Sequence, residues 1–487
     1  MLLLICALTP LLLGGALPFL RIRKRSGRMI YVMAAACLTS VLTGYVIISG
    51  YTGAIELFRL SDQFICALRL DGAGRVYLGL AALLWPLATL YAVEYMRHEE
   101  REGNFFCWYL TAYSAAVLLS AADNLFTLYV FYELLTMCTV PLVWHKQDDQ
   151  STHAALIYML YLIGAAAMGF VAMVGLQREG LEAFRLGGSI KQMNQWTEIF
   201  VLLALLGFGA KAALFPLCHW LPTASVAPTP VTALLHAVAV VNAGVFSVMR
   251  ILYYAVGTEA IQSVLSLPVH IVMILAVFTI LLGAVMAVRE QHVKKRLAWS
   301  TVSNLSYMLF GLCIGCFGEN AGMAAGMAHM VFHGITKIIL FFCIGAVTIQ
   351  TGRTHVRQMH GLGKKMPVVF LCYTLAGVSL VGIPPLPVFV SKYALISSAF
   401  QNGSTGALIG SISLLAAAVL TVIYIFSVVY PAFFMKLHLD SGEDMPRDPG
   451  QCIKISLVLL CALLLLSGAF AGKIMAYLTS LAEGSIV

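Results

Sequence analysis

Long apolar runs alternate with short polar connections over nearly all of the 487 residues. Each run is about 20 residues long, the length that a helix needs to cross the roughly 30 Å hydrocarbon core of a bilayer. We count roughly fourteen such runs and expect each to form a transmembrane helix. Their approximate centres are Leu11, Ala36, Leu84, Leu110, Leu134, Ala166, Leu206, Val240, Ala276, Phe310, Leu340, Gly377, Leu414 and Leu463.

The composition is that of a membrane protein. Hydrophobic residues make up 60% of the chain and charged residues 11%, and the mean hydropathy is +0.90, far from the balance of a soluble domain. The first run is followed by RIRKRSGR without the small-residue cleavage site of a secretory signal, so we expect it to remain as the first helix. The predicted fold is an all-α polytopic membrane protein, with no connection long enough for a soluble domain.

Most basic residues lie in every second connection. The net charge of +8 is therefore explained by the positive-inside rule, which places Lys and Arg in cytoplasmic loops, and we expect no nucleic-acid partner. The rule predicts that both termini lie on the outer side of the membrane. We expect this membrane to be the inner (cytoplasmic) membrane of a prokaryotic cell. The connection from Gln177 to Trp196 is the exception, with some basic residues on the predicted outer side. The basic connections run from Arg21 to Arg28, Arg97 to Arg101, His145 to His153, Arg289 to Arg296, Arg353 to Lys365 and Lys436 to Arg447.

Ionisable side chains also stand near the middle of apolar runs. A charge at the centre of a bilayer costs roughly 2.5 to 3.5 kcal/mol on insertion scales, so such residues usually mark an ion pathway or a partner. Together they favour a route for charge through the membrane over a purely structural role. These residues are Glu133, Lys211, His236, Lys337 and Lys392.

The spacing around Lys337 adds a second indication. His329, His333 and Lys337 are each four residues apart, which places them on one face of a helix. Imidazoles accept and release protons near neutral pH, and burial makes a lysine readier to release its proton. The spacing therefore predicts a row of groups that hand protons along the membrane plane.

Prolines predict breaks beside two of the lysines. A helix that contains them loses backbone donors and is interrupted, and freed carbonyls at such a break can solvate a charge. Paired discontinuous helices in corresponding places point to inverted repeats and a mid-membrane ion site. The prolines are Pro216 and Pro222 after Lys211, and Pro384, Pro385 and Pro387 before Lys392.

Each residue also has a simpler interpretation. His236 alone is readily a hydrogen-bonded packing residue, Lys392 can extend toward an interface, and Glu133 with Lys211 can form an ion pair that only holds two helices together. The CxxC of Cys313 and Cys316 lies within an apolar run, where free cysteines pack as small hydrophobes. We therefore expect no metal, iron–sulfur cluster or other cofactor in this chain.

Four segments carry a resemblance to a known family. They are KAALFPLCHWLPTASVAPTPVTALLHA from Lys211, VKKRLAWSTVSNLSYM from Val293, HMVFHGITKIILFFCIGAV from His329 and GLGKKMP from Gly361. With them the chain resembles the antiporter-like subunits of respiratory complex I, of membrane-bound group 4 hydrogenases and formate hydrogenlyases, and of multisubunit Mrp sodium/proton antiporters. The resemblance runs from about the third apolar run to the thirteenth.

The resemblance implies two inverted five-helix repeats, at 104–254 (helices 4 to 8) and 268–433 (helices 9 to 13), with helices 7 and 12 discontinuous. Helices 1 to 3 would occupy 1–103, and helix 14 would occupy 451–487. The roles it implies are these: Glu133 pairs with Lys211 and adjusts its proton affinity, His236 is a relay, Lys337 is the central lysine with His329 and His333 beside it, and Lys392 is the exit group.

The sequence departs from the family pattern at three positions that the predicted orientation places near the cytoplasmic side. Thr223 and Ser225 stand where members often have an acidic residue and a histidine, and His292 stands where many have Asp. The route of proton uptake is therefore less defined than the central axis. The sequence ends at Val487, soon after the fourteenth run. We therefore expect one of the shorter subunits of the family, similar to the complex I M and N types or to Mrp D.

The sequence thus predicts a proton-translocating membrane subunit that takes its energy from redox chemistry in partner subunits. The expected partners are related antiporter-like membrane subunits, peripheral redox subunits with Fe–S clusters and a NiFe centre or flavin, the lipid bilayer, and protons or Na⁺. The main alternative is an Mrp-type Na⁺/H⁺ antiporter subunit. Another is a scaffold that anchors a peripheral enzyme without transporting ions.

Overall fold

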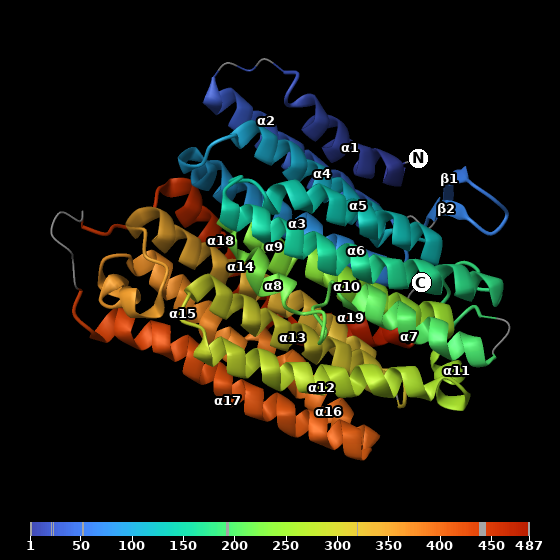
Figure 1. Cartoon of the computed structure of the whole chain (residues 1–487). Coiled ribbons are helices and arrows are strands. Elements are labelled where there is room, and N and C mark those ends of the chain that lie inside the picture. Colours follow the sequence, from blue (N-terminus) through green and yellow to red (C-terminus); the bar gives the residue numbers. More distant parts are fainter. Residues whose placement is uncertain are drawn as a thin grey trace.

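The computed structural model describes residues 2–20, 22, 24–50, 53–190, 194–318, 320–437 and 445–485 as a bundle of helices that run side by side (Figure 1). The helices of the first half are α1 (Leu2–Ala16), α2 (Arg25–Ile48), α3 (Gly72–Tyr95), α4 (Glu102–Ser120), α5 (Leu125–Val143), α6 (Asp149–Arg178), α7 (Gln195–Gly209), α8 (Trp220–Thr223), α9 (Thr229–Ala237) and α10 (Val240–Met249). Those of the second half are α11 (Thr258–Ser263), α12 (Ser266–Arg289), α13 (Val293–Gly315), α14 (Ala321–Thr351), α15 (Pro367–Val381), α16 (Pro387–Asn402), α17 (Thr405–Phe434), α18 (Gln451–Ala469) and α19 (Ala471–Ala482).

Short helical turns and one hairpin complete the described chain. The 3₁₀ turns are η1 (Met96–His98), η2 (Ala224–Val226), η4 (Val356–Met359) and η5 (Leu362–Lys364), and η3 (Arg250–Val256) is a π-helix that continues α10. Strands β1 (Ile55–Arg59) and β2 (Ile65–Leu68) pair antiparallel between α2 and α3. The all-α prediction had no strands. The strands lie in the connection between the second and third apolar runs. Phe58 and Phe64 of the hairpin pack edge-on against Phe126.

The apolar runs of the sequence form the helices of the bundle. Each of the fourteen centres given above lies in a helix. In the described part of the chain, 10 helical segments are long and apolar enough to cross a membrane, while α1 and α7 are shorter and α15 follows a bend of 116° from the segment before it. The prediction of a polytopic helical membrane protein is therefore confirmed, and the two-fold relation between its halves remains a prediction.

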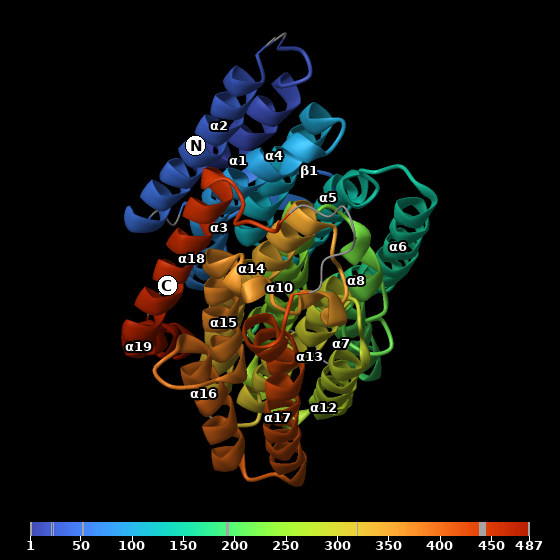
Figure 2. The ribbon, with the colours of Figure 1, turned by 90° about the vertical axis from the view of Figure 1, so that its left-hand side faces the viewer.

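The bundle encloses α13 and almost all of α14. Helices α1, α2 and α4 lie at one edge and α12, α16 and α17 at the other (Figures 1 and 2). Between these edges, α13 is buried along its apolar length. Helix α14 contacts α3, α9, α13, α15 and α16. Side chains on α13 and α14 are thus shielded from lipid, so polar groups there must find partners inside the protein.

Both predicted helix breaks are present. Helix α7 already ends at Gly209, before Pro216, and the chain continues through turns to the short α8. Helix α15 ends at Val381, and Pro384 and Pro385 lie in the gap before α16 begins. Two further breaks were not predicted: α9 and α10 divide the eighth run, and α18 and α19 divide the last segment, which was expected to be one helix.

The connections gather on two opposite faces. One, which we call the hairpin face, carries β1–β2 and the connections around Asp123 and Phe184, which are joined by backbone hydrogen bonds. The other, the basic face, carries His292 and His355, whose rings lie 5.5 Å apart, and Lys146, which lies 3.9 Å from Glu99. The prediction that the basic face is cytoplasmic remains a prediction. Residues 21, 23, 191–193, 438–444 and 487, which belong to regions discussed above, lie outside the described residues.

Candidate functional site

The apolar run predicted that Lys211 would lie in the middle of a helix. In the structure it lies in the first break. Helix α7 ends two residues earlier, at Gly209, and the Lys211 side chain is 0% exposed. Its Nζ donates a hydrogen bond to the Tyr132 carbonyl oxygen of α5 and lies 3.4 Å from the centre of the Tyr132 ring. Gly244 lets α10 approach this break, because a Cβ there would lie 2.3 Å from the Ala212 nitrogen.

Glu133 follows Tyr132 on α5 but does not contact Lys211. Within the described chain the two form no ion pair, and Glu133 Oε1 is buried without a hydrogen-bond partner. The two charges still interact through space. Glu133 and Lys211 therefore do not form, in this structure, the ion pair that the family resemblance implies.

His236 lies on α9, between the two halves of the buried axis. The side chain is fully buried, its ring centre is 4.6 Å from that of Phe341 on α14, and neither ring nitrogen has a hydrogen-bond partner among the described residues. Gly334 allows this packing, since a Cβ there would lie 2.6 Å from the Ala237 carbonyl oxygen.

Lys337 lies on α14 and is held by neutral groups of α13. Its Nζ donates to the Leu297 carbonyl oxygen and to Ser300 Oγ, each at 2.8 Å. Ser300 Oγ is also 2.6 Å from the Tyr424 hydroxyl. These oxygens replace part of the hydration of the ammonium group without adding a negative charge.

The two histidines predicted on the same face of α14 stack on each other, with ring centres 5.8 Å apart. Within the described chain, neither ring nitrogen of His333 has a hydrogen-bond partner. His329, in contrast, lies 3.0 Å from Ser391 Oγ through Nδ1 and 3.2 Å from Asn304 Oδ1 through Nε2. Asn304 and Ser391 belong to α13 and α16 and were not among the predicted site residues.

Lys392 lies on α16, directly after the second break. Its Nζ donates to the Leu380 carbonyl oxygen at 2.8 Å and to the Val381 carbonyl oxygen at 3.2 Å. These carbonyls end α15, where Gly382, with a φ of 92°, terminates the helix. A helix C-terminus carries partial negative charge and favours a cation. The Tyr307 ring lies 5.5 Å from the same Nζ.

The structure thus gathers the predicted residues in two groups. Lys337, His333, His329 and Lys392 form one continuous cluster around α13, α14 and α16, while Lys211 and Glu133 stand apart on α5 and the α7 break. His236 lies between the groups, beside Phe341 of α14.

The three positions that depart from the family pattern lie on or near the basic face. Thr223 and Ser225 donate to backbone carbonyls four residues earlier. His292 lines a cavity of about 220 Å³ with Ser225, Lys294 and Asp148. Burial, followed by the nearby charges of Lys294 and His355, lowers the pKa of His292 to about 4.

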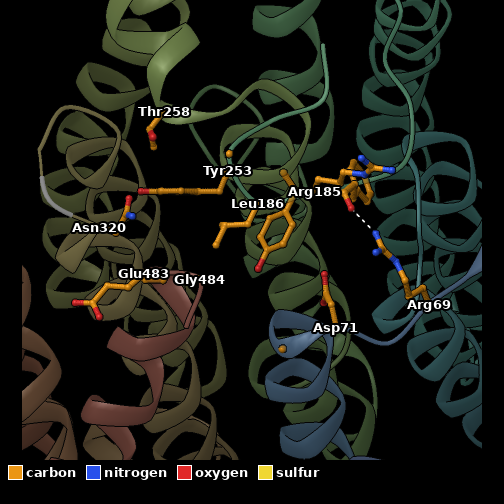
Figure 3. Close-up of a pocket in the computed structure, with 14 residues that line it drawn as sticks. Arg69, Asp71, Arg185, Leu186, Tyr253, Thr258, Asn320, Glu483 and Gly484 are labelled. Carbon is orange, nitrogen blue, oxygen red and sulfur yellow. Dashed lines mark hydrogen bonds between the residues drawn. The ribbon is translucent and has the colours of Figure 1, made fainter. Parts of the chain in front are cut away.

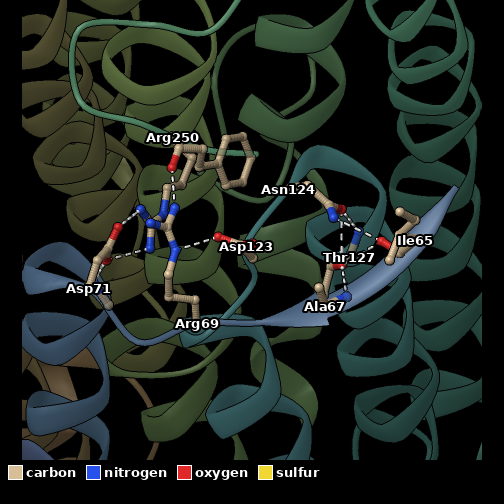
Figure 4. A network of polar contacts seen from close by, with 10 residues as sticks. Ile65, Ala67, Arg69, Asp71, Asp123, Asn124, Thr127 and Arg250 are labelled. Carbon is tan, nitrogen blue, oxygen red and sulfur yellow. Dashed lines mark hydrogen bonds and ion pairs between the residues drawn. The ribbon is translucent and has the colours of Figure 1, made fainter. Parts of the chain in front are cut away.

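A second group of charges, on the hairpin face, was missed by the sequence reasoning. Arg250 is 1% exposed and pairs with Asp71, and Arg69 pairs with Asp123 at 2.5 Å (Figure 4). Burial alone would raise the pKa of Asp71, yet the Arg250 guanidinium outweighs it and holds that pKa below its usual range. An arginine inside an apolar run was the available signal, because it requires a buried partner.

This network borders a cavity of about 510 Å³ on the hairpin face (Figure 3). Its lining brings together segments far apart in sequence, including Arg69 and Asp71 before α3, Tyr253 of η3, Asn320 before α14 and Glu483 after α19. The Arg250–Asp71 pair therefore ties the start of α3 to η3, and the Arg69–Asp123 pair ties the segment after the hairpin to the connection between α4 and α5.

Fold and buried residues together define a class: multi-pass membrane proteins with an axis of lysines and histidines through the interior of the bundle. Residues 122–423 match the family described as NADH:quinone oxidoreductase/Mrp antiporter, transmembrane. The chain belongs to this family of antiporter-like membrane subunits. The motifs from Lys211, Val293, His329 and Gly361 all lie within the matched residues.

Named relatives come from both branches of the family. The chain is 32% identical over 386 residues to NAD(P)H-quinone oxidoreductase subunit 5, organellar chromatophore 1, of Paulinella chromatophora, covering 75% of this chain and 55% of that protein. It is 27% identical over 429 residues to Na⁺/H⁺ antiporter subunit A1 of Staphylococcus haemolyticus (strain JCSC1435), covering 83% and 52%. The chain spans about half the length of these relatives, and its subunit type remains a prediction.

Solved structures share the whole fold. A chain of the membrane-bound sulfane sulfur reductase, an archaeal respiratory membrane complex, superposes with a TM-score of 0.86 at 23% identity, covering 99% of this chain and 97% of that one. A chain of the Mrp complex from Dietzia sp. DQ12-45-1b gives 0.82 at 19% identity, with the same coverage.

Proposed function

We propose that this chain is a proton-translocating subunit in the membrane part of a multisubunit energy-converting complex. The observation that carries the proposal is the burial of three lysines, Lys211, Lys337 and Lys392, at 0%, 0% and 6% exposure. Their hydrogen bonds go to carbonyl and hydroxyl oxygens. An ammonium group with neutral partners can lose its proton without leaving a buried carboxylate unpaired.

The proposed sequence of events begins at Glu133 and Lys211. When their charges approach, the ammonium form of Lys211 is stabilised, and when they separate, as here, it releases its proton toward His236. The proton then passes to Lys337, along His333 and His329, and leaves at Lys392. Moving one charge against 100 mV requires about 2.3 kcal/mol, which a change in one buried charge interaction supplies at an effective dielectric constant of about 20.

Partner subunits supply the driving force in this proposal. The relatives named above are subunits of quinone oxidoreductases and antiporter complexes, so we assign this chain related membrane subunits as neighbours. We further propose peripheral redox subunits, with iron–sulfur clusters and a NiFe centre or flavin, as the energy source. The chain itself would hold no redox group, and the bilayer is that of a prokaryotic cell.

A second candidate is an Mrp-type Na⁺/H⁺ antiporter subunit, in which a sodium gradient replaces redox chemistry. It is favoured by the likeness to antiporter subunit A1 and to the Dietzia Mrp complex. Proton flux that depends on sodium, in vesicles without an electron donor, distinguishes this candidate from the first.

The first experiment is purification of the tagged complex from its native membranes, with mass spectrometry of the subunits and assays for Ni and Fe. Iron–sulfur subunits support the redox-driven proposal, whereas small antiporter subunits without metal support the Mrp alternative. Proton translocation is then measured in vesicles that carry Lys211→Ala, with the exposed Lys364→Ala as the control. We expect no coupled transport in Lys211→Ala and normal transport in the control; full transport in Lys211→Ala overturns the proposed function.

A further inference from the structure

The hydrogen bonds around His329 fix which ring nitrogen carries a hydrogen. Asn304 Nδ2 lies 2.7 Å from the Ser300 carbonyl oxygen. A carbonyl only accepts, so this contact sets the orientation of the Asn304 amide and turns its Oδ1 toward His329. Oδ1 is also only an acceptor and lies 3.2 Å from His329 Nε2. Nε2 must therefore carry a hydrogen in both the neutral and the protonated ring.

The opposite nitrogen faces a hydroxyl that has two acceptors. Ser391 Oγ lies 3.0 Å from His329 Nδ1 and 3.1 Å from the Val388 carbonyl oxygen of its own helix. When His329 is neutral, the Ser391 hydroxyl donates to Nδ1. When His329 gains a proton on Nδ1, that N–H donates to Ser391 Oγ, and the hydroxyl hydrogen turns to Val388. Both protonation states are then satisfied by rotation of one hydroxyl.

We propose that Asn304 and Ser391 are positioning residues that make His329 a proton station working through Nδ1 alone. The inference rests on the proposed function. The proton that passes from His333 binds at Nδ1 and leaves from Nδ1 toward Lys392, while the other hydrogen stays on Nε2 and donates to Asn304 Oδ1. Since Ser391 directly precedes Lys392 on α16, the exchanging nitrogen faces the helix that carries the exit lysine.

The surroundings of His329 support a directed station. The groups that face it are Tyr307 of α13, with ring centres 5.4 Å apart, His333 of α14 at 5.8 Å, and Lys392 of α16, whose charge acts on His329 through space. Neither nitrogen of His333 has a hydrogen-bond partner among the residues that the structure describes. A histidine without fixed partners therefore lies beside one whose ring is oriented by two.

The test is ¹⁵N NMR of histidine-labelled complex, in which ring nitrogen shifts separate protonated from unprotonated nitrogens and His329→Gln assigns the signal. We expect the neutral ring to carry its hydrogen on Nε2, and Asn304→Leu to lose this preference. A neutral ring with its hydrogen on Nδ1 overturns the proposal. The wild-type spectrum decides this even where Asn304→Leu does not assemble.

Transport provides the second readout. Ser391→Ala removes the rotating hydroxyl and is expected to slow proton translocation about tenfold, the effect of losing one buried hydrogen bond of ordinary strength, while Ser391→Thr retains the hydroxyl and restores the rate. The control is Ser411→Ala, which removes a buried hydroxyl bonded to the Ala407 carbonyl of α17. Equal rates in Ser391→Ala and wild type overturn the role of Ser391. Because the NMR readout does not depend on transport, failure of this inference is separable from failure of the Lys211 test.

Discussion

The buried lysines of the two halves differ in what surrounds them. Lys211 lies against the Tyr132 ring and near the Glu133 carboxyl, with one backbone carbonyl as its hydrogen-bond partner. Lys337 and Lys392 are each held by two oxygens of carbonyls or hydroxyls. In the described part of the chain no carboxylate forms an ion pair with either of them.

In the proposed function, this difference gives the two halves different tasks. Two charges 4 Å apart interact by about 4 kcal/mol at an effective dielectric constant of 20, whereas a hydrogen bond to a charged group contributes about 1.5 to 3 kcal/mol. Bringing the Glu133 charge to 4 Å from Lys211 therefore changes the energy of Lys211 by more than the loss of one neutral hydrogen bond changes that of Lys337. The first half is suited to receive a signal, and the second half to pass the proton on.

The largest expected effect comes from replacing lysine by arginine in both halves. Arginine keeps the positive charge but does not release a proton under physiological conditions. We expect Lys211→Arg and Lys337→Arg each to reduce proton translocation by about 100-fold or more, within the range that positioned proton-transfer groups contribute. The measurement is dye-detected acidification of inverted vesicles.

The arginine variants separate transport from structure. A lysine that only balances charge between helices tolerates arginine, so full transport in Lys211→Arg would show that the first site is structural. Exposed Lys364→Arg is the matched control and is expected to transport normally. Loss in one half alone would break the assumption that both lysines lie on one path.

A smaller effect, confined to the first half, is expected for Glu133→Gln. The amide keeps the shape of the side chain but removes the charge that acts on Lys211, so coupled transport should fall about tenfold, which corresponds to about 1.4 kcal/mol. The measurement is the rate of coupled translocation at saturating donor. A matched change of an exposed carboxyl, Glu483→Gln, controls for charge alone, and an unchanged rate in Glu133→Gln contradicts a signalling role for the acid.

The sequence predicted the buried charges better than their partners. Helix breaks near Pro216 and Pro385 and the row from His329 to Lys337 follow from proline chemistry and helical spacing. The partners were not predictable, because Leu297 and Leu380 act through backbone carbonyls and any residue type supplies those. Lys211 was expected inside a helix, since the apolar run continues past Gly209 where α7 ends.

A second pair of variants, Ser300→Ala and Tyr132→Leu, sharpens the comparison by removing one partner from Lys337 and one from Lys211. Ser300→Ala takes one of two hydrogen bonds from Lys337 and is expected to destabilise the protein by about 1 to 3 kcal/mol. Tyr132→Leu takes the ring from Lys211, for about 0.5 to 2 kcal/mol beyond the packing loss. Thermal unfolding in detergent measures both. If Tyr132→Phe, which keeps a ring, is as unstable as Tyr132→Leu, the lost Tyr132 hydroxyl bond to Phe208 explains the effect instead.

The smallest effect concerns His292, which immediately precedes α13, the helix whose Leu297 and Ser300 accept hydrogen bonds from Lys337. Burial and the charges of Lys294 and His355 lower its pKa from about 6.5 to about 4 in the folded protein. Between these values the unfolded chain binds more protons, so stability is complete above pH 6.5 and falls as the pH drops toward 4. We expect the melting temperature to fall over this interval by roughly 2 °C through this residue.

The contribution of His292 is isolated by comparison with His292→Gln, which cannot gain a charge. The variant should lose less stability than the wild type between pH 6.5 and 4, and the two should differ by a constant amount above pH 7. His292→Asp should keep its stability between pH 6.5 and 4 and lose it only at lower pH, because a carboxylate beside Lys294 stabilises the fold while it is ionised. Parallel curves for all three proteins would show that the start of α13 does not sense protons, and that pH acts on the second half through its buried axis alone.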